Sequence, residues 1–291
     1  MSKYLIFGAT GQLGFVIYQL LKTKGCSVTG ASRHGPDVVH DLCDTKSTIA
    51  LLTTLKPNVV INCAAIVALQ ACEDDFQRAL TINSYPSDLL ACYAIKFGYK
   101  YVYISTDHYY LGKDNVLHSE SDPLSCVNRY AQSKYLGEVF ASQCPDHLVL
   151  RTNITGFRIY PSSSATFAEW LISSLLLRKP LSLFNDFYSS TIDVRSAAFV
   201  ILFLIESNAT GLYNLASSQS VSKLSFASTM AKVLDISLDW HVEASCLQLS
   251  PRRANTLGLS TVKLTSQYPS LILPSVEQVC VNLIDWYREL N

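Results

Sequence analysis

The sequence carries few charged residues, and neither sign is in excess. Charged residues make up 16% of the 291 positions, and 23 Lys and Arg are balanced by 23 Asp and Glu, so the formal net charge is zero. Without a basic surplus, we expect no electrostatic binding to a nucleic acid backbone or an anionic membrane surface. The hydrophobic fraction of 49% indicates instead a globular chain with a substantial core.

Long apolar runs and a leader segment are also missing. The longest strongly apolar run, Ala197 to Ile205, is far shorter than the ~20 residues that a membrane-spanning helix needs. The chain enters a strand-like pattern at Lys3, without a charged leader or a small-residue cleavage site. These features predict a cytoplasmic protein without a membrane partner.

Metal-binding and disulfide patterns are absent as well. The nine cysteines include no C-x-x-C pair, and the six histidines show no H-E-x-x-H spacing. We therefore expect reduced, mostly buried cysteines and no metal site.

The first half of the chain does contain an alternation of strand-like and helix-like segments. Short runs rich in β-branched and aromatic residues alternate with longer segments of helical period. The predicted strands cover residues 4–7, 27–31, 59–62, 101–105 and 148–152, and the predicted helices cover 12–24, 46–56, 85–97 and 128–143. This alternation predicts an α/β fold with a doubly wound parallel sheet, the Rossmann arrangement.

The alternation breaks after about residue 155. Residues 161–164 (Pro-Ser-Ser-Ser) are a loop signal, and the later helical patterns cover 165–177 and 193–206, the second begun by Asp193. Residues 211–215 have the pattern of a short strand, and the remainder is rich in turns.

Two domains follow from this change of pattern. We predict a dinucleotide-binding domain over residues 1–155 and a smaller, mixed substrate-binding lobe over 156–291. About 193–216 are expected to return to the first domain. Ligands of open α/β sheets bind beyond the carboxyl ends of the strands, so we expect the substrate there.

A glycine-rich segment follows the first predicted strand and opens the first predicted helix. Its glycines, at positions 8, 11 and 14, are spaced G-x-x-G-x-x-G. In this context they allow a tight turn, close approach of the backbone to a pyrophosphate, and close packing of helix on strand, while the helix N-terminus supplies free N–H groups. The residues predicted to bind the cofactor here are Gly8, Thr10, Gly11, Gln12 and Leu13.

The end of the second predicted strand favours NADPH. NAD-binding Rossmann domains usually place a carboxylate there, about 20 residues beyond the glycines, to hold a ribose diol. This chain has Ser32 and Arg33 instead, which can hold a 2′-phosphate. Because Arg33 can equally be an ordinary solvated arginine, NADH stays open as the cofactor.

A tyrosine and a lysine, Tyr130 and Lys134, lie one helical turn apart, so both can reach one point. A nearby ammonium stabilises phenolate relative to phenol, which makes tyrosine a better proton donor near neutral pH. Tyr18 and Lys22 share this spacing, but they belong to the helix after the glycine loop and are assigned to packing. Thr106 follows the fourth predicted strand and can share a carbonyl oxygen with the phenol, so the three residues predict proton transfer to a carbonyl.

Together these motifs resemble the extended short-chain dehydrogenases/reductases and, within them, the dTDP-4-dehydrorhamnose reductase family. The likeness runs from residue 3 to about 290, and implies NADPH-dependent reduction of the C4 carbonyl of a nucleoside-diphospho-4-keto-6-deoxyhexose in deoxysugar biosynthesis. The segments that carry it are the glycine loop, Asn62-Cys63-Ala64-Ala65, Thr81 to Pro86, Ser105-Thr106-Asp107, Tyr130 to Glu138, and Arg252 to Thr256.

The resemblance implies a role for each matching residue. Thr106 would polarise the carbonyl, Tyr130 would donate the proton, and Lys134 would hold the nicotinamide ribose and make the phenol more acidic. Arg253 would contact the sugar nucleotide. Cofactor contacts are implied for Asp41 and Leu42 at the adenine, and for Cys63, Ala64, Ala65 and Asn83 elsewhere. Packing of small residues at 62–65 and a surface charge at Arg253 are the alternatives.

Three departures from the family pattern fall in substrate-facing segments. His108 replaces an aromatic residue, residues 151–156 lack a tryptophan, and residues 185–191 lack the expected Gln, Gly and Pro. A lone histidine is either a packed residue or a contributor to sugar specificity or proton transfer. The predicted substrate contacts are Asp107, His108, Asn153 and Arg253.

Two other functions stay open from the sequence alone. One is a sugar-nucleotide epimerase or dehydratase that retains NAD through its cycle, although Arg33 in place of an acid speaks against it. The other is a non-catalytic regulatory subunit, because that of methionine adenosyltransferase is similar to the same family. A homodimer also stays open, because dimers are common among soluble proteins.

Overall fold

The computed structural model describes residues 2–112, 115–160 and 165–291, so the loop predicted over 161–164 lies outside the described residues. The chain forms two compact units, each built from three segments. Unit 1 comprises Met1–Thr106, Asn128–Arg151 and Ile201–Tyr213, and unit 2 comprises Asp107–Val127, Thr152–Val200 and Asn214–Asn291.

A seven-stranded sheet organises unit 1, with the strand order β12-β7-β5-β4-β1-β2-β3. The pairings of β1 with β2 and β4, of β4 with β5, of β5 with β7 and of β2 with β3 are all parallel. The strands are β1 (Lys3–Phe7), β2 (Ser27–Ser32), β3 (Val38–Val39), β4 (Val59–Asn62), β5 (Lys100–Ile104), β7 (His147–Thr152) and β12 (Gly211–Leu215). The predicted doubly wound sheet is confirmed.

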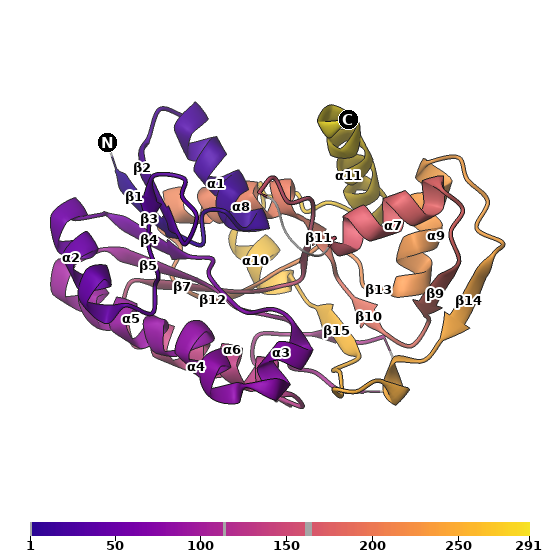
Figure 1. The fold of residues 1–291 in the computed structure, drawn as a ribbon, viewed down its shortest axis with the longest axis horizontal. Helices are drawn as coiled ribbons and strands as arrows, with labels where there is room; N and C mark the ends of the chain where they lie inside the picture. Colours follow the sequence, from indigo (N-terminus) through magenta and orange to yellow (C-terminus); the bar gives the residue numbers. More distant parts are fainter. Residues whose placement is uncertain (1, 113–114, 161–164) are drawn as a thin grey trace. The chain divides into compact units, whose positions relative to one another are not determined.

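Helices cover both faces of this sheet. Figure 1 shows α2, α5 and α6 on one side of the strands and α1 with α8 on the other. The helices with residues in unit 1 are α1 (Gln12–Thr23), α2 (Thr45–Leu55), α3 (Leu69–Asp74), α4 (Phe76–Asn83), α5 (Tyr85–Phe97), α6 (Arg129–Ala141) and the second half of α8 (Val194–Glu206). The four helices predicted in the first half are α1, α2, α5 and α6, whereas α3 and α4 were not predicted.

Burial on both faces explains the composition of the central strands. All four residues of β4 are buried, and β1 is buried after its first residue. Parallel strands covered by helices on both sides become continuous apolar runs in this way. Polar caps then set where helices begin: Asn128 accepts from the Ala131 N–H at 2.8 Å, and α6 starts at the next residue.

Unit 2 is built from short strands and separate helices. Its sheets are β13-β10-β15-β6, β11-β8 and β14-β9. The strands are β6 (Leu117–His118), β8 (Ile154–Thr155), β9 (Leu181–Phe184), β10 (Tyr188–Ser189), β11 (Ile192–Asp193), β13 (Val221–Ser222), β14 (His241–Ala244) and β15 (Thr256–Leu259). The helices are α7 (Phe167–Leu176), α9 (Lys223–Val233), α10 (Val262–Gln267), α11 (Val276–Leu290), the first half of α8, and a single 3-10 turn at Cys246–Gln248.

Two further sequence expectations concern the start of α8 and the cysteines. Asp193 begins α8 as predicted, because its carboxylate accepts from the Ser196 N–H at 2.9 Å. Each of the nine cysteines is a free thiol, but only four of them are buried, so the expectation that most are buried was wrong. Across the described ranges, none of the helices is both long enough and apolar enough to cross a membrane.

Candidate active site

The glycine turn of unit 1 is fixed by close backbone approaches. Gly8 has a φ of +76°, and a Cβ there would lie 2.7 Å from the Ala64 nitrogen. A Cβ on Gly14 would collide with the carbonyl oxygen of Gly8, so α1 can pack this closely on the turn only with glycine at that position. The Gly11 N–H donates to the Gly8 oxygen at 2.9 Å and closes the turn.

The N-terminus of α1 supplies backbone donors beside this turn. Its N-cap is Gly11, which has no side chain to accept from the first-turn N–H groups. Such groups, together with the positive end of the helix dipole, suit a phosphate. The narrow glycine cradle and these donors fit the diphosphate of a dinucleotide.

The end of β2 places the predicted adenosine contacts near one another. The Thr10 hydroxyl donates to Ser32 Oγ at 3.1 Å, and Ser32 donates in turn to the Gly35 carbonyl. Arg33 is exposed, and its positive charge acts to lower the pKa of the Cys43 thiol. An exposed guanidinium next to a serine hydroxyl at this strand end fits a phosphate on the adenosine ribose.

Asp41 and Leu42 follow β3. Asp41 is exposed and its carboxylate accepts from the Cys43 N–H at 3.0 Å, whereas Leu42 is buried. Burial, ahead of the nearby Asp41 carboxylate, raises the pKa of the Cys43 thiol to about 11, so the thiol stays neutral.

The segment after β4 is braced by Asn83. The Asn83 amide donates to the Ile66 oxygen at 3.1 Å and to Ser133 Oγ at 2.9 Å, and its oxygen accepts from the Ile66 N–H at 2.8 Å. Asn83 therefore ties the loop that holds Cys63, Ala64 and Ala65 to α6. Because its amide bonds to these protein groups, Asn83 positions the segment that is predicted to border the cofactor.

The three residues predicted to be catalytic all belong to unit 1. Thr106 lies two residues beyond the end of β5 and is 3% exposed. Tyr130 lies in the first turn of α6 and belongs to a buried apolar cluster with Cys72 and Ala79. Lys134 lies one turn further along α6, and its Nζ donates to the Ile104 oxygen at 2.6 Å, at the carboxyl end of β5.

The Lys134 ammonium occupies an apolar setting. It is 3% exposed and its Nζ lies 4.2 Å from the centroid of the Tyr103 ring. Burial lowers the pKa of Lys134 to about 7, although Cys63 and Glu138 act in the opposite direction. Near neutral pH this group is therefore poised between its charged and neutral forms.

A buried ion pair that the sequence analysis did not assign fixes the strand end next to Thr106. Arg151 on β7 holds the Glu138 carboxylate through Nη2 at 2.5 Å and Nε at 3.2 Å. The same carboxylate accepts from the Ser105 hydroxyl at 2.7 Å. Glu138 ends the segment from Tyr130 that resembles the family, so this motif was the feature of the sequence that could have pointed to the ion pair.

The four residues predicted to contact substrate come together in unit 2. Asn153 donates to the Asp107 carboxylate at 2.8 Å, and the His108 Nε2 lies 4.0 Å from the other Asp107 oxygen. Arg253 is close enough to influence the charge state of His108. Within the described residues the buried Arg253 Nε has no hydrogen-bond partner, so it is a donor still to be satisfied.

His108 is a neutral imidazole in this cluster. Burial, and then the positive charges of Arg253 and Lys223, lower its pKa to about 4. Its ring lies 6.4 Å from that of Phe187, centroid to centroid. A neutral imidazole can donate and accept hydrogen bonds at physiological pH, which suits recognition of hydroxyl groups.

Three further polar residues of this cluster were not predicted. They are Ser189, Thr191 and Lys223, which join Asn153 through hydrogen bonds. Ser189 and Thr191 lie in the segment noted only for its departure from the family pattern. Nothing in the sequence near position 223 marks its lysine as different from any other.

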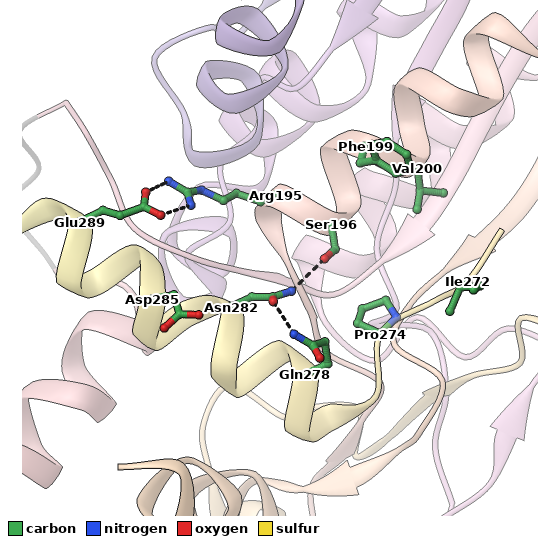
Figure 2. Close-up of a pocket in the computed structure, with 10 residues that line it drawn as sticks. All are labelled: Arg195, Ser196, Phe199, Val200, Ile272, Pro274, Gln278, Asn282, Asp285 and Glu289. Carbon is green, nitrogen blue, oxygen red and sulfur yellow. Dashed lines mark hydrogen bonds and ion pairs between the residues drawn. The ribbon is translucent and has the colours of Figure 1, made fainter.

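A surface cavity of about 610 Å³ lies elsewhere in unit 2, between α8 and α11 (Figure 2). Arg195 and Glu289 pair across one end of it, and Asn282 bonds to Ser196 and Gln278 in its wall. Its described lining includes none of the residues predicted to bind cofactor or substrate.

The parallel sheet, the glycine turn and the tyrosine–lysine pair of α6 define a dinucleotide-dependent oxidoreductase of the extended short-chain dehydrogenase/reductase class. Residues 2–268 match the family described as RmlD substrate binding domain, and the chain belongs to that family. The resemblance seen in the sequence is confirmed.

Relatives of similar length support this placement. The spore coat polysaccharide biosynthesis protein SpsK of Bacillus subtilis is 27% identical over 231 residues, which cover 79% of this chain and 78% of SpsK. The dTDP-4-dehydrorhamnose reductase of Salmonella typhimurium is 26% identical over 275 residues, which cover 91% of this chain and 85% of that enzyme.

Solved structures show the same fold. A dTDP-4-dehydrorhamnose reductase from Clostridium acetobutylicum superimposes with a TM-score of 0.86 at 23% identity, covering 98% of this chain and 99% of that one. The Bacillus anthracis enzyme in complex with NADP gives 0.85 at 22% identity, covering 97% and 98%. At these identities the likeness concerns the fold.

Proposed function

We propose that this protein reduces the C4 carbonyl of a nucleoside-diphospho-4-keto-6-deoxyhexose with NADPH. The observation that carries the proposal is the arrangement in unit 1. Thr106 lies two residues beyond β5, Lys134 donates to the last residue of that strand, and Tyr130 lies one turn before Lys134 on α6. The nearby glycine cradle fits a dinucleotide, and the family contains dTDP-4-dehydrorhamnose reductases.

In the proposed reaction the C4 ketone gains a hydride at carbon and a proton at oxygen. NADPH supplies the hydride when bound. The Thr106 hydroxyl donates a hydrogen bond to the ketone oxygen and polarises it, and the Tyr130 phenol donates the proton to that oxygen as it becomes an alkoxide. Lys134 holds the nicotinamide ribose and, when charged, stabilises the phenolate left behind on Tyr130.

The proposed cofactor contacts follow the chain of unit 1. The diphosphate is held by Gly8, Thr10, Gly11, Gln12 and Leu13, and Ser32 with Arg33 hold the 2′-phosphate, which favours NADPH over NADH. The adenine lies against Asp41 and Leu42. Cys63, Ala64 and Ala65 border the cofactor, with Asn83 as their brace.

The proposed sugar-nucleotide contacts are the unit 2 residues Asp107, His108, Asn153 and Arg253. The relatives named for dTDP-linked sugars make dTDP the first nucleotide to test. The lost tryptophan and the presence of His108 alter the substrate-facing segments, so the preferred hexose is expected to differ from the family pattern.

The test is NADPH consumption by the purified protein with dTDP-4-keto-6-deoxyhexoses. Tyr130→Phe should lower kcat by about 10²–10⁴-fold, because it removes the proton donor, and should leave NADPH binding intact. The matched control is Tyr18→Phe, since Tyr18 also lies one turn before a lysine, with Lys22 Nζ 5.2 Å from its ring centroid. This control should keep most of the turnover.

Other outcomes would point elsewhere. Tightly retained NAD with no net consumption of NADPH would favour an epimerase or dehydratase. Unchanged turnover in Tyr130→Phe would defeat the assigned chemistry. Absence of turnover on every keto-sugar, with copurification of a partner enzyme, would favour a regulatory protein.

A further inference from the structure

Lys223 lies at a position where helix formation does not favour a cation. It is the first residue of α9, directly after the N-cap Ser222. A positive charge at a helix N-terminus opposes the helix dipole, so this lysine does not help α9 to form. Burial also lowers the pKa of Lys223 to about 8, although Asp107 acts to raise it. The charge of Lys223 therefore costs stability at this position, so the reason for a lysine here must lie in the contacts of its ammonium.

The ammonium is held by hydroxyl groups and flanked by aromatic rings. Its Nζ donates to Ser189 Oγ at 3.1 Å and to Thr191 Oγ1 at 3.4 Å. The rings of Phe167 and Phe187 have centroids 4.8 Å and 5.3 Å from it. An ammonium has three N–H donors, and the described residues supply acceptors for two of them. The residue as a whole is partly exposed, and we assign the third donor to a ligand.

Hydrogen bonds connect Lys223 to the residue that follows Thr106. Thr191 donates to the Asn153 oxygen at 2.9 Å, and the Asn153 amide donates to the Asp107 carboxylate at 2.8 Å. The hydrogen bonds therefore run from Lys223 through Thr191 and Asn153 to Asp107. Because the lysine can only donate, it fixes which group donates at each later step of this series. Loss of the ammonium would leave the hydroxyls of Ser189 and Thr191 free to reorient.

The chemistry of the cluster fits a hexose better than a diphosphate. The carboxylate of Asp107 balances the ammonium of Lys223, and His108 is neutral. Hydroxyl, amide, imidazole and carboxylate groups together offer both donors and acceptors, which sugar hydroxyls require because each donates and accepts. A diphosphate calls instead for a donor-rich site with a positive excess, whereas here a carboxylate and an amide lie among the donors.

We propose that Lys223 is a specificity-determining residue that binds a hydroxyl group of the substrate hexose. Its third N–H donates to that hydroxyl, while its bonds to Ser189 and Thr191 hold the Asn153–Asp107 pair in the orientation that receives the sugar. The assignment rests on the proposed function, because it names the part of the sugar nucleotide that this cluster reads.

The test compares Lys223→Met, which keeps the length of the side chain without its donors, with the wild type. We expect KM for the dTDP-4-keto-6-deoxyhexose to rise about tenfold or more, the size of one lost hydrogen bond to a charged group. KM for NADPH should stay unchanged. The inhibition constant of dTDP, which lacks the hexose, should also stay unchanged. The matched control is Lys232→Met, an exposed lysine in the last turn of the same helix.

A second variant guards against misfolding of the first. Thr191→Val removes one hydroxyl of the series with little change in shape, and it should raise the same KM by a smaller factor. An equal rise in the inhibition constant of dTDP would assign Lys223 to the diphosphate and overturn the proposal. An unchanged KM in Lys223→Met would overturn it as well.

Failure of the proposed function has its own signature. If the wild type reduces no keto-sugar, calorimetric binding of dTDP-glucose is compared with that of dTDP. A gain in affinity from the glucose that disappears in Lys223→Met would support the hexose contact without the reaction. Equal affinities of the wild type for the two ligands, or a gain that persists in the variant, would overturn it.

Discussion

Lys134 is a residue whose position serves the proposed chemistry at a cost in stability. Its pKa falls from an ordinary value of about 10.4 to about 7 in the folded chain, because burial penalises the ammonium. Between these two values the unfolded chain binds the proton and the folded chain does not. The stability of the fold therefore declines as the pH falls from about 10 to about 7, and the full cost is present below about 7.

Lys134→Met should therefore separate stability from activity. We expect the variant to lose most turnover and to unfold at a higher temperature than the wild type, with a gain on the order of 1–3 kcal/mol near pH 6. The gain should shrink toward pH 10, where the wild-type lysine is neutral in the folded state and is losing its charge in the unfolded one. The lost hydrogen bond to the Ile104 oxygen reduces the gain at every pH by about 1 kcal/mol.

Thermal unfolding of both proteins across this pH range, without ligands, measures the effect. A gain that is equal at pH 6 and pH 10 would show that the buried charge is not its source. A variant less stable than the wild type at pH 6 would mean that the contacts of Lys134 outweigh the cost of its charge.

Site residues could be predicted where a local pattern implies proximity. Tyr130 and Lys134 are four positions apart, so a helix over this segment places them on the same face. Lys223 could not be found in this way, because its partners Ser189 and Thr191 lie more than thirty positions earlier in the chain. Only the folded unit 2 brings these residues together.

At the scale of elements, buried strands were predictable and short paired ones were not. The strands β1, β4 and β5 carry continuous apolar runs because helices cover both of their faces. In contrast, β10 has two residues and pairs with β15 across more than sixty positions, so no local period reveals it. Strands of this length depend on tertiary contacts rather than on their own pattern.

The missed helix α11 had a readable signal. Ser275 caps it by accepting from the Gln278 N–H at 3.1 Å, and its buried residues recur at helical spacing. These are Val276, Val279, Cys280, Leu283, Ile284 and Trp286. A search of the C-terminal segment for caps would have found it, whereas α3, with six residues, is too short for a reliable period.

Packing of α6 against β5 depends on Gly137. A Cβ there would meet the Tyr103 hydroxyl and lie 2.5 Å from the Asn83 carbonyl oxygen. Alanine favours a helix by about 1 kcal/mol over glycine, yet we expect Gly137→Ala to destabilise the protein by about 2 kcal/mol because the helix must move away from the strand. Turnover should fall as well, since Tyr130 and Lys134 move with α6.

Urea unfolding and initial rates measure the two effects of Gly137→Ala. The control is Val139→Ala on the same helix, where the side chain is 40% exposed and a change within about 0.5 kcal/mol is expected. A stabilised Gly137→Ala protein would show that α6 and β5 are not in tight contact.

At the scale of the whole molecule, the proposed cofactor and substrate residues belong to different units. The glycine turn, Arg33 and the segment after β4 lie in unit 1, whereas His108, Asn153 and Lys223 lie in unit 2. A ligand that binds only the native protein stabilises what it contacts, by about 2.7 kcal/mol at one hundred times its dissociation constant. The two ligands should therefore protect different backbone amides.

Hydrogen exchange read by mass spectrometry tests this division. NADP should slow exchange mainly in peptides covering residues 8–13, 32–42 and 63–65, and dTDP-glucose mainly in those covering 107–108, 153 and 223. Protection of residues 8–13 by dTDP-glucose alone would contradict the assignment of ligands to units, and so would protection of 107–108 by NADP alone.

The chain first passes from unit 1 to unit 2 at the peptide bond between Thr106 and Asp107. The residue before this bond is thus the group assigned to the ketone, and the residue after it belongs to the cluster assigned to the hexose. For enzyme engineering, this separates the choice of sugar from the redox machinery. A combinatorial library confined to His108, Asn153, Thr191 and Lys223 would diversify the accepted keto-sugars while every clone inherits an unaltered nicotinamide-binding half.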